Sequence, residues 1–411
     1  MMSKYAKDKR PTVKPVIKAE LSEKNKWVRV IAIAVLLVLG VGAIVYSAVR
    51  FFGNTRGYTE IKADSVYSDL FVLNYDIGAS GASASSEKRR VSELYSDTLD
   101  RYSRLLSSDT EYMGVYNIYY INSHPGEDIK IDAFLYSALK TMEQSGERLH
   151  YLGTVLELYD SVFSSSEDAY AAMNDPKKDV EAREFCKKSA EYANDEKSVS
   201  LKFLEDNTVR LELSDEYAEF TASFGLSRYI DLGVFENAFI VDGIAEAMVA
   251  ENMTFGAISS YDGYARNLDE RGEEYSFSVY GKYSDTVYPA CSASYTGKIS
   301  TVAFKSYPTT GLGALGYYMY ADGEVANSFI DKATGLSRTS LSDLLLADKD
   351  ENCVSLALKA YSNFTSEAFD KGDLEGASAV WIEENKIFKI GDALTLGSAY
   401  SDDNVSFEIS E

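Results

Sequence analysis

The chain has 411 residues, with 64 acidic against 41 basic side chains, a formal net charge of −23 and two histidines. So acidic a chain repels phosphate backbones, which argues against nucleic acid as a partner, and two histidines exclude a multi-histidine metal site. Cys186, Cys291 and Cys353 are too far apart for a zinc ribbon or a CxxC redox motif; one pair could form a disulfide, but we expect three buried thiols.

The N-terminal region predicts a membrane anchor. Residues 1–29 carry nine lysines and arginines against three acidic residues, and residues 30–49 are 20 consecutive uncharged, mostly apolar residues. Such a run spans a bilayer as a helix, and the basic flank places the N-terminus in the cytoplasm and the remainder of the chain outside the cell. A cleaved signal peptide is the alternative interpretation. Residues 50–65 are expected to form a tether.

Helical patterns dominate the next part of the chain. An amphipathic helix is expected to begin after a cap at Ser85 or Ser86 and to run to residue 106. A second is predicted between Asp132 as N-cap and Gly146 as stop, and a third over residues 148–165. His124 in a predicted turn and His150 in the third helix are both expected to be structural. The polar residues 164–200 predict an insertion or a separate lobe rather than core.

From residue 208 onward the pattern changes to strands. The alternation in Thr208–Leu213 predicts a strand with one buried face, and a helix is expected over Glu236–Asn252. Short strands and turns follow, among them residues 353–361, and residues 378–390 predict a hairpin. The acidic residues 391–411 are expected to be a loose C-terminal tail. Helices followed by strands predict an α+β fold.

One segment, DLGVFENAFIVD at residues 231–242, resembles a known signature. It is similar, without a gap, to the Asp-Leu-Gly-Gly-Ile-Ala-Lys-Gly-Tyr-Ala-Val-Asp segment of the FAD:protein FMN transferase family (ApbE-type). The pattern SFIDKATG at residues 328–335 also resembles this family's His-Ile-Ile-Asp-Pro-x-Thr-Gly. The resemblance covers residues 66–390 and implies an ApbE-like, T-fold-like α+β ectodomain.

The resemblance also implies a cofactor site. In the family, acidic and hydroxyl groups hold magnesium against the pyrophosphate of FAD. Carried over by motif, the metal ligands would be Thr365, or Glu367 if the register shifts by two, and no catalytic residue is assigned. The implied cofactor-binding residues are Asp231, Gly233, Asp242, Asp262, Asp331, Thr334 and Gly335.

Several signature positions depart from the family pattern. The lysine is replaced by Asn237, two glycines by Ser260 and Tyr261, and the histidine by Ser328. Side chains in place of glycines intrude where a phosphate approaches the backbone. We therefore expect a membrane-anchored, extracytoplasmic relative whose transfer site has decayed and which acts as a binding or accessory module. The alternatives are an active magnesium-dependent transferase that flavinylates exported redox proteins, and a cell-surface structural or interaction protein.

A short motif at Ser80–Ser85, SGASAS, resembles the sequence on which bacterial flavoproteins carry covalent FMN. Ser83 is therefore a flavinylation candidate. The same residues are ordinary loop and helix-cap chemistry, and short motifs of this kind arise often by chance.

Overall fold

The computed structural model describes residues 57–284, 286–309, 311–374 and 376–410. The predicted cytoplasmic tail and the predicted membrane segment 30–49 lie outside these residues. Within the described ranges, no helix is both long and apolar enough to cross a membrane. The predicted tether is wrong at its C-terminal end, because β1 (Gly57–Ile61) is paired antiparallel with β2.

The framework is a nine-stranded sheet in the order β1-β2-β6-β7-β10-β15-β16-β17-β19. All neighbouring strands are antiparallel except β17 and β19. The expected hairpin of residues 378–390 is present as β16 and β17, with Glu384 in the turn at a φ of 57°. After β1 the strands are β2 Phe71–Ile77, β6 Gly256–Ser260, β7 Tyr264–Asn267, β10 Ile299–Lys305, β15 Asp343–Asp348, β16 Ser378–Glu383, β17 Lys386–Ile390 and β19 Glu408–Ile409.

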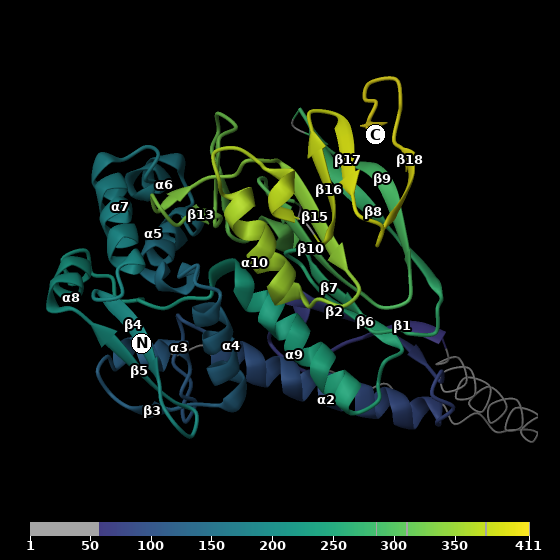
Figure 1. Cartoon of the computed structure of the whole chain (residues 1–411), viewed down its shortest axis with the longest axis horizontal. Helices are drawn as coiled ribbons and strands as arrows, with labels where there is room; N and C mark the ends of the chain where they lie inside the picture. Colours follow the sequence, from purple (N-terminus) through teal and green to yellow (C-terminus); the bar gives the residue numbers. More distant parts are fainter. Residues whose placement is uncertain (1–56, 285, 310, 375, 411) are drawn as a thin grey trace, which may run out of the picture. The chain divides into compact units, whose positions relative to one another are not determined.

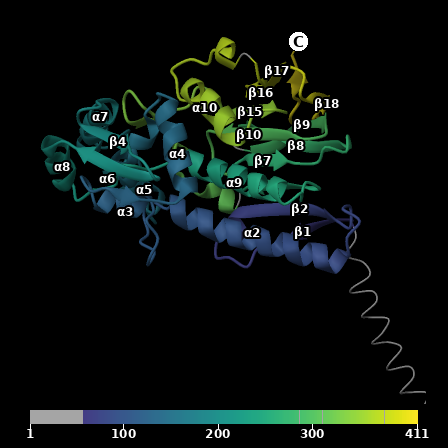
Figure 2. The ribbon, with the colours of Figure 1, turned by 60° about the horizontal axis from the view of Figure 1, so that its bottom comes forward.

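Three helices cover one face of this sheet, and Figures 1 and 2 show α9 lying between the long helix α2 and α10, in contact with both. They are α2 (Ala84–Leu106), α9 (Glu236–Ala250) and α10 (Cys353–Phe364). The helix predicted over Glu236–Asn252 is confirmed as α9. The prediction of short strands and turns over residues 353–361 is wrong, because these residues form α10, capped by Asn352.

A smaller sheet covers the opposite face. It has the order β18-β9-β8, with bounds Thr395–Ala399, Thr286–Thr296 and Glu274–Tyr283. Alternate residues of β15 serve two cores: Leu344 and Leu346 face the helices, while Leu345 packs with the residues of β8 and β9. A strand that is buried on both faces typically has a continuous apolar sequence, which accounts for the LLLA sequence of β15.

The predicted loose C-terminal tail is wrong for the described residues. β18 pairs with β9, and β19 pairs with β17. Val405 and Phe407 are buried in the second core. The partner of β18 lies more than a hundred residues earlier in the chain, since Thr395 pairs with Ser294 and Ala399 with Cys291. The acidic local composition does not reveal such a partner.

A lobe of helices with a third sheet, β3-β5-β4, lies on the opposite side of the described structure from the β18-β9-β8 sheet (Figure 1). The strand predicted at Thr208–Leu213 is confirmed as β5, and the second predicted helix as α4, with Asp132 accepting from the backbone N–H of Phe134. Residues 164–200 belong to this lobe, but the expectation that they lie outside the core is wrong, because α7 contributes buried side chains, including Phe185, to the main core. The remaining bounds are α3 Ile118–Ser123, β3 Ile129–Lys130, α4 Ala133–Gln144, α5 Gly153–Phe163, α6 Asp168–Asn174, α7 Val180–Asn194, β4 Val199–Phe203, α8 Asp215–Ala222, β11 Tyr317–Met319, β12 Val325–Asn327, β13 Ile330–Asp331 and β14 Leu336–Ser337.

Candidate functional site

A cavity of about 900 Å³ lies where the lobe of helices meets the main sheet. Its walls are the C-terminal end of α2 with the following loop, α5, the turn leading into α9, the β6–β7 turn and the start of β11. The predicted residues Asp231, Gly233 and Asp262 line it, together with the replaced signature positions Asn237 and Tyr261. The cavity therefore brings the signature segment, residues 231–242, next to the β6–β7 turn that contains Tyr261 and Asp262. Its volume is in the range of small-molecule sites.

Asp231 and Gly233 form a tight turn at the start of the signature. The backbone N–H of Gly233 donates to Oδ1 of Asp231 at 2.6 Å, and Gly233 has a φ of +54°. A Cβ at Gly233 would come within 3.0 Å of a methyl carbon of Leu156. Both the conformation and the close approach favour glycine here. The turn directs the chain into α9 and fixes the Asp231 carboxylate at the cavity wall.

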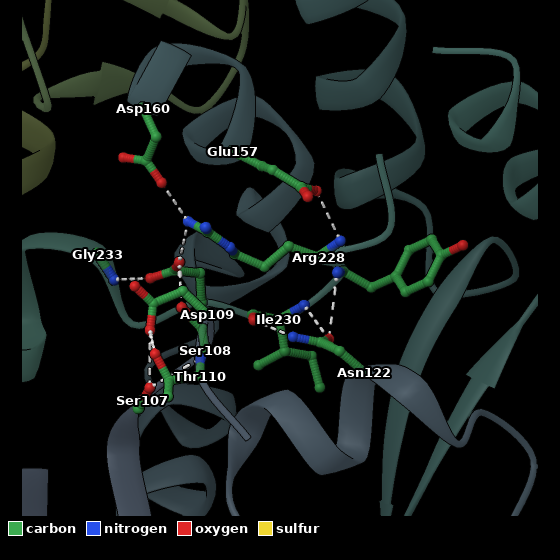
Figure 3. A network of polar contacts seen from close by, with 12 residues as sticks. Ser107, Ser108, Asp109, Thr110, Asn122, Glu157, Asp160, Arg228, Ile230 and Gly233 are labelled. Carbon is green, nitrogen blue, oxygen red and sulfur yellow. Dashed lines mark hydrogen bonds and ion pairs between the residues drawn. The ribbon is translucent and has the colours of Figure 1, made fainter. Parts of the chain in front are cut away.

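Arg228 is the centre of the polar network in Figure 3. Its Nη1 lies 2.6 Å from Oδ2 of Asp160 and 3.0 Å from Oδ2 of Asp231. Ser108 donates to the same Asp231 oxygen at 2.7 Å. Among the described residues that line the cavity, Arg228 is the one cation, and these two carboxylates already compensate it. Arg228 was not predicted from the sequence; its position three residues before Asp231 is the only available signal.

Asp262 faces Asn237, the residue that stands at the position of the signature lysine. The side chain of Asn237 donates to Oδ2 of Asp262 at 3.0 Å, and Ser260 donates to Oδ1 at 2.5 Å. Both partners are neutral. Burial raises the pKa of Asp262 from 3.8 to about 6, against the lowering effect of these hydrogen bonds. An amide in the lysine position therefore leaves this carboxylate without a compensating positive charge.

Glu236 is a cavity residue that sequence reasoning missed. It lines the cavity at the first turn of α9 and, among the described residues, its carboxyl group makes neither a hydrogen bond nor an ion pair. Burial raises its pKa from 4.5 to about 8, and the carboxylates of Asp231 and Asp109 add to the shift. Near neutral pH this group is therefore largely protonated, although a helix N-terminus ordinarily favours the charged form.

Asp242 lies outside the cavity lining and organises two helices. Its carboxylate accepts from the backbone N–H groups of Cys353 and Val354, at 3.0 and 2.9 Å, and lies 3.3 Å from Nη1 of Arg266. It therefore caps the N-terminus of α10 from α9, satisfying two donors that a helix end leaves free. This capping role explains why position 242 is an aspartate, and the explanation requires no cofactor.

Asp331, Thr334 and Gly335 form the turn between β13 and β14, also away from the cavity lining. Asp331 accepts from the backbone N–H of Ala333 and from the hydroxyl of Thr334, at 2.9 and 3.0 Å. Gly335 has a φ of +67°, and a Cβ there would lie 2.4 Å from the carbonyl oxygen of Cys186. The geometry of the turn explains Asp331 and Thr334, and close packing against α7 explains Gly335.

The two predicted metal ligands do not meet at the cavity. Thr365 is buried at the C-terminal cap of α10, where its hydroxyl donates to the carbonyl of Tyr361 at 2.9 Å. The side chain of Glu367 is 85% exposed and lies 3.6 Å from Arg338. In the described part of the chain, no group of three or more His, Cys, Asp or Glu side chains is arranged to hold a metal ion. The residues present thus do not fit the family's magnesium site.

Ser83 is the N-cap residue of α2, so the predicted cap at Ser85 or Ser86 is wrong by two or three residues. Its side chain is exposed and interacts with that of Ser85 at 3.2 Å. The cavity lies at the other end of α2, at Ser103 and Ser107. Twenty residues of helix separate the two ends by about 30 Å. Ser83 therefore lies far from this cavity.

His150 and the three cysteines are buried in the interior of the protein. His150 is buried beside Glu143, with 3.1 Å between Nε2 and the carboxylate, and burial lowers its pKa. All three cysteines are buried free thiols, as expected.

The fold is that of the ApbE-type proteins. No protein family model matches the chain, and no curated protein matches its sequence. Among solved structures, the ApbE protein from Thermotoga maritima matches with a TM-score of 0.54 and 14% identity, over 79% of this chain and 94% of that one. A histidine-to-glycine mutant of the flavin transferase ApbE from Vibrio cholerae matches with a TM-score of 0.50 and 12% identity, over 84% of this chain and 97% of that one. The predicted resemblance is confirmed, and at these identities it establishes the fold.

Proposed function

We propose that this chain is a ligand-binding relative of the flavin transferases that does not transfer FMN. The supporting observation is the charge of the cavity wall. Five carboxylate residues line it against one guanidinium, and that guanidinium is already paired with two of them. Near neutral pH Glu236 is largely protonated, but Asp262 keeps a charge that no cation compensates. A pyrophosphate entering such a site is repelled at short range, where a low dielectric strengthens the repulsion.

The absence of a fitting metal site among the described residues supports the same conclusion. Magnesium would bring positive charge to the pyrophosphate and needs hard oxygen ligands in octahedral geometry. Thr365 and Glu367 are engaged elsewhere, one at a helix end and the other at the surface. The chain has a cavity of ligand size, while Asn237 stands at the position of the signature lysine. A binding role requires the cavity but no metal site.

The test follows thermal unfolding of the purified full-length chain in detergent, with FAD and magnesium added together, separately and not at all. A ligand that binds only the folded state raises the unfolding midpoint. We expect no shift at about 1 mM ligand and no FMN-sized mass increase, either on this chain or on an added exported flavoprotein. The Vibrio cholerae flavin transferase serves as the positive control. A shift that needs both ligands, or a transferred FMN, would show an active transferase and refute the proposal.

The first 49 residues are the basis for a proposal on the location of the chain. We propose that residues 30–49 anchor it in the cell membrane as a single span, with the N-terminus cytoplasmic and residues 57–411 outside. The net charge of +6 in residues 1–29 supports this orientation. Protease added to intact cells should digest the ectodomain and spare an N-terminal epitope tag. Protection of the ectodomain until the cells are lysed would contradict the orientation.

A further inference from the structure

The cavity contains carboxyl groups that no cation among the described residues compensates. Of the five carboxylates, Asp160 and Asp231 are paired with Arg228. Among the described residues, Asp109 accepts hydrogen bonds from the hydroxyls of Ser107 and Thr110, at 2.8 and 2.9 Å. Asp262 has neutral partners, and Glu236 has none among the described residues. Asp109 is exposed, whereas Asp262 and Glu236 are half-buried. Burying a carboxylate without a cation is costly and leaves Glu236 largely protonated near neutral pH. A cationic ligand beside Glu236 would favour its ionised form.

The remaining lining is aromatic and apolar. Tyr67 and Tyr112 share a hydrogen bond of 2.5 Å between their hydroxyls, and Tyr261, Tyr317, Phe163 and Phe329 lie around the same space. Aromatic faces attract organic cations and also cover the apolar body of a ligand. This lining is independent of the acidic residues and points to the same class of ligand.

A bare metal ion fits these observations less well than an organic cation. The carboxylates come from different walls of the cavity, and no three of the described ligating side chains converge to hold a metal. A volume of about 900 Å³ is far larger than an ion requires and suits a molecule with an apolar body.

We infer that the cavity binds an organic ammonium ion with an apolar body, whose charge lies against Glu236, Asp262 and Asp109 and whose body lies among the tyrosine and phenylalanine rings. This inference rests on the proposed function. It names the ligand class of the same cavity, and it assigns to Glu236 the role of a direct ligand contact.

The test uses two probes of matched shape, 2-phenylethylamine and 2-phenylethanol, which differ in charge at neutral pH. Binding to the full-length chain in detergent is measured by isothermal titration calorimetry. We expect the amine to bind about tenfold or more tightly than the alcohol, because a buried charge-assisted contact is worth more than a kilocalorie per mole. Equal affinities, or no binding of the amine at about 10 mM, would overturn the inference.

Variants locate the contact. Glu236→Gln should weaken amine binding about tenfold and leave alcohol binding unchanged. Glu246→Gln, at an exposed position on the same helix, is the matched control and should change neither. An unaltered amine affinity in Glu236→Gln would overturn the assignment of this residue. Tighter binding of the anion 3-phenylpropanoate than of the amine would overturn the inference but leave the proposed function standing, whereas FMN transfer in the earlier assay would refute the proposed function itself.

Discussion

The carboxyl group of Glu236 makes the stability of this protein depend on pH in a specific way. Its pKa is raised from 4.5 to about 8 in the folded chain. Because the folded state holds this proton more tightly than the unfolded state, the group favours folding below about pH 4.5. That contribution is lost as the pH rises from about 4.5 through about 8. Glu236→Gln keeps the shape of the side chain and removes the titration.

The size of the effect follows from the shift. A difference of roughly 3.5 pKa units corresponds to about 5 kcal/mol if the group is fully shielded from water. Glu236 is only half-buried and faces a cavity that water can enter, so we expect about 2 kcal/mol after screening. Glu236→Gln should therefore match the wild type near pH 4.5 and exceed its unfolding free energy by about 2 kcal/mol near pH 9.

Urea unfolding of the full-length chain in detergent, followed by tryptophan fluorescence at pH 4.5, 7 and 9, measures this difference. Glu246→Gln, at an exposed position of the same helix, is the matched control for the exchange of a glutamate for a glutamine. A flat difference for Glu236→Gln over the whole range would show that its carboxyl is well solvated, and the reasoning on the charge of the cavity would fail with it.

Three further predictions concern backbone geometry and helix caps, and each is checked by urea unfolding. Gly335→Ala should cost about 3 kcal/mol, since it combines a positive φ with a backbone contact at 2.4 Å. Gly323→Ala, with a positive φ and open space around it, should cost only about 1 kcal/mol, and equal costs would contradict the packing argument. Asp242→Ala should cost about 3 kcal/mol, because it removes the cap of α10 and leaves a half-buried arginine unpaired; a loss below about 1 kcal/mol would disprove that role. Ser83→Ala should change stability by less than about 0.5 kcal/mol, because its side chain makes no cap hydrogen bond, whereas Asn352→Ala should cost about 1 kcal/mol. A larger effect at the serine than at the asparagine would reverse this interpretation.

Local signals in the sequence were sufficient where the structure is decided locally. Asp132 and Gly146 mark the two ends of α4 as expected, because capping depends on a few neighbouring residues. The alternation of Thr208–Leu213 correctly predicts a strand, because one face of β5 is buried. The signature at residues 231–242 pointed to the fold that the solved structures confirm.

The prediction failed where partners distant in the sequence decide the outcome. In residues 353–361, Val354, Leu356 and Leu358 alternate as in a strand, yet the segment is helical. Its first turn is capped by Asp242, more than a hundred residues earlier. The C-terminal strand β18 likewise depends on its pairing with β9. Neither partner can be found from the local pattern alone.

The sequence by itself determined the net charge, the two ends of α4 and the replacement of the signature lysine by Asn237. Only the tertiary structure decided which charges face one another. Asp109, Asp160 and Glu236 come from a loop and two helices and meet around one cavity. The physical reason is that the energy of a charge depends on its neighbours and its burial within a few ångströms. Those distances exist only once the chain has folded.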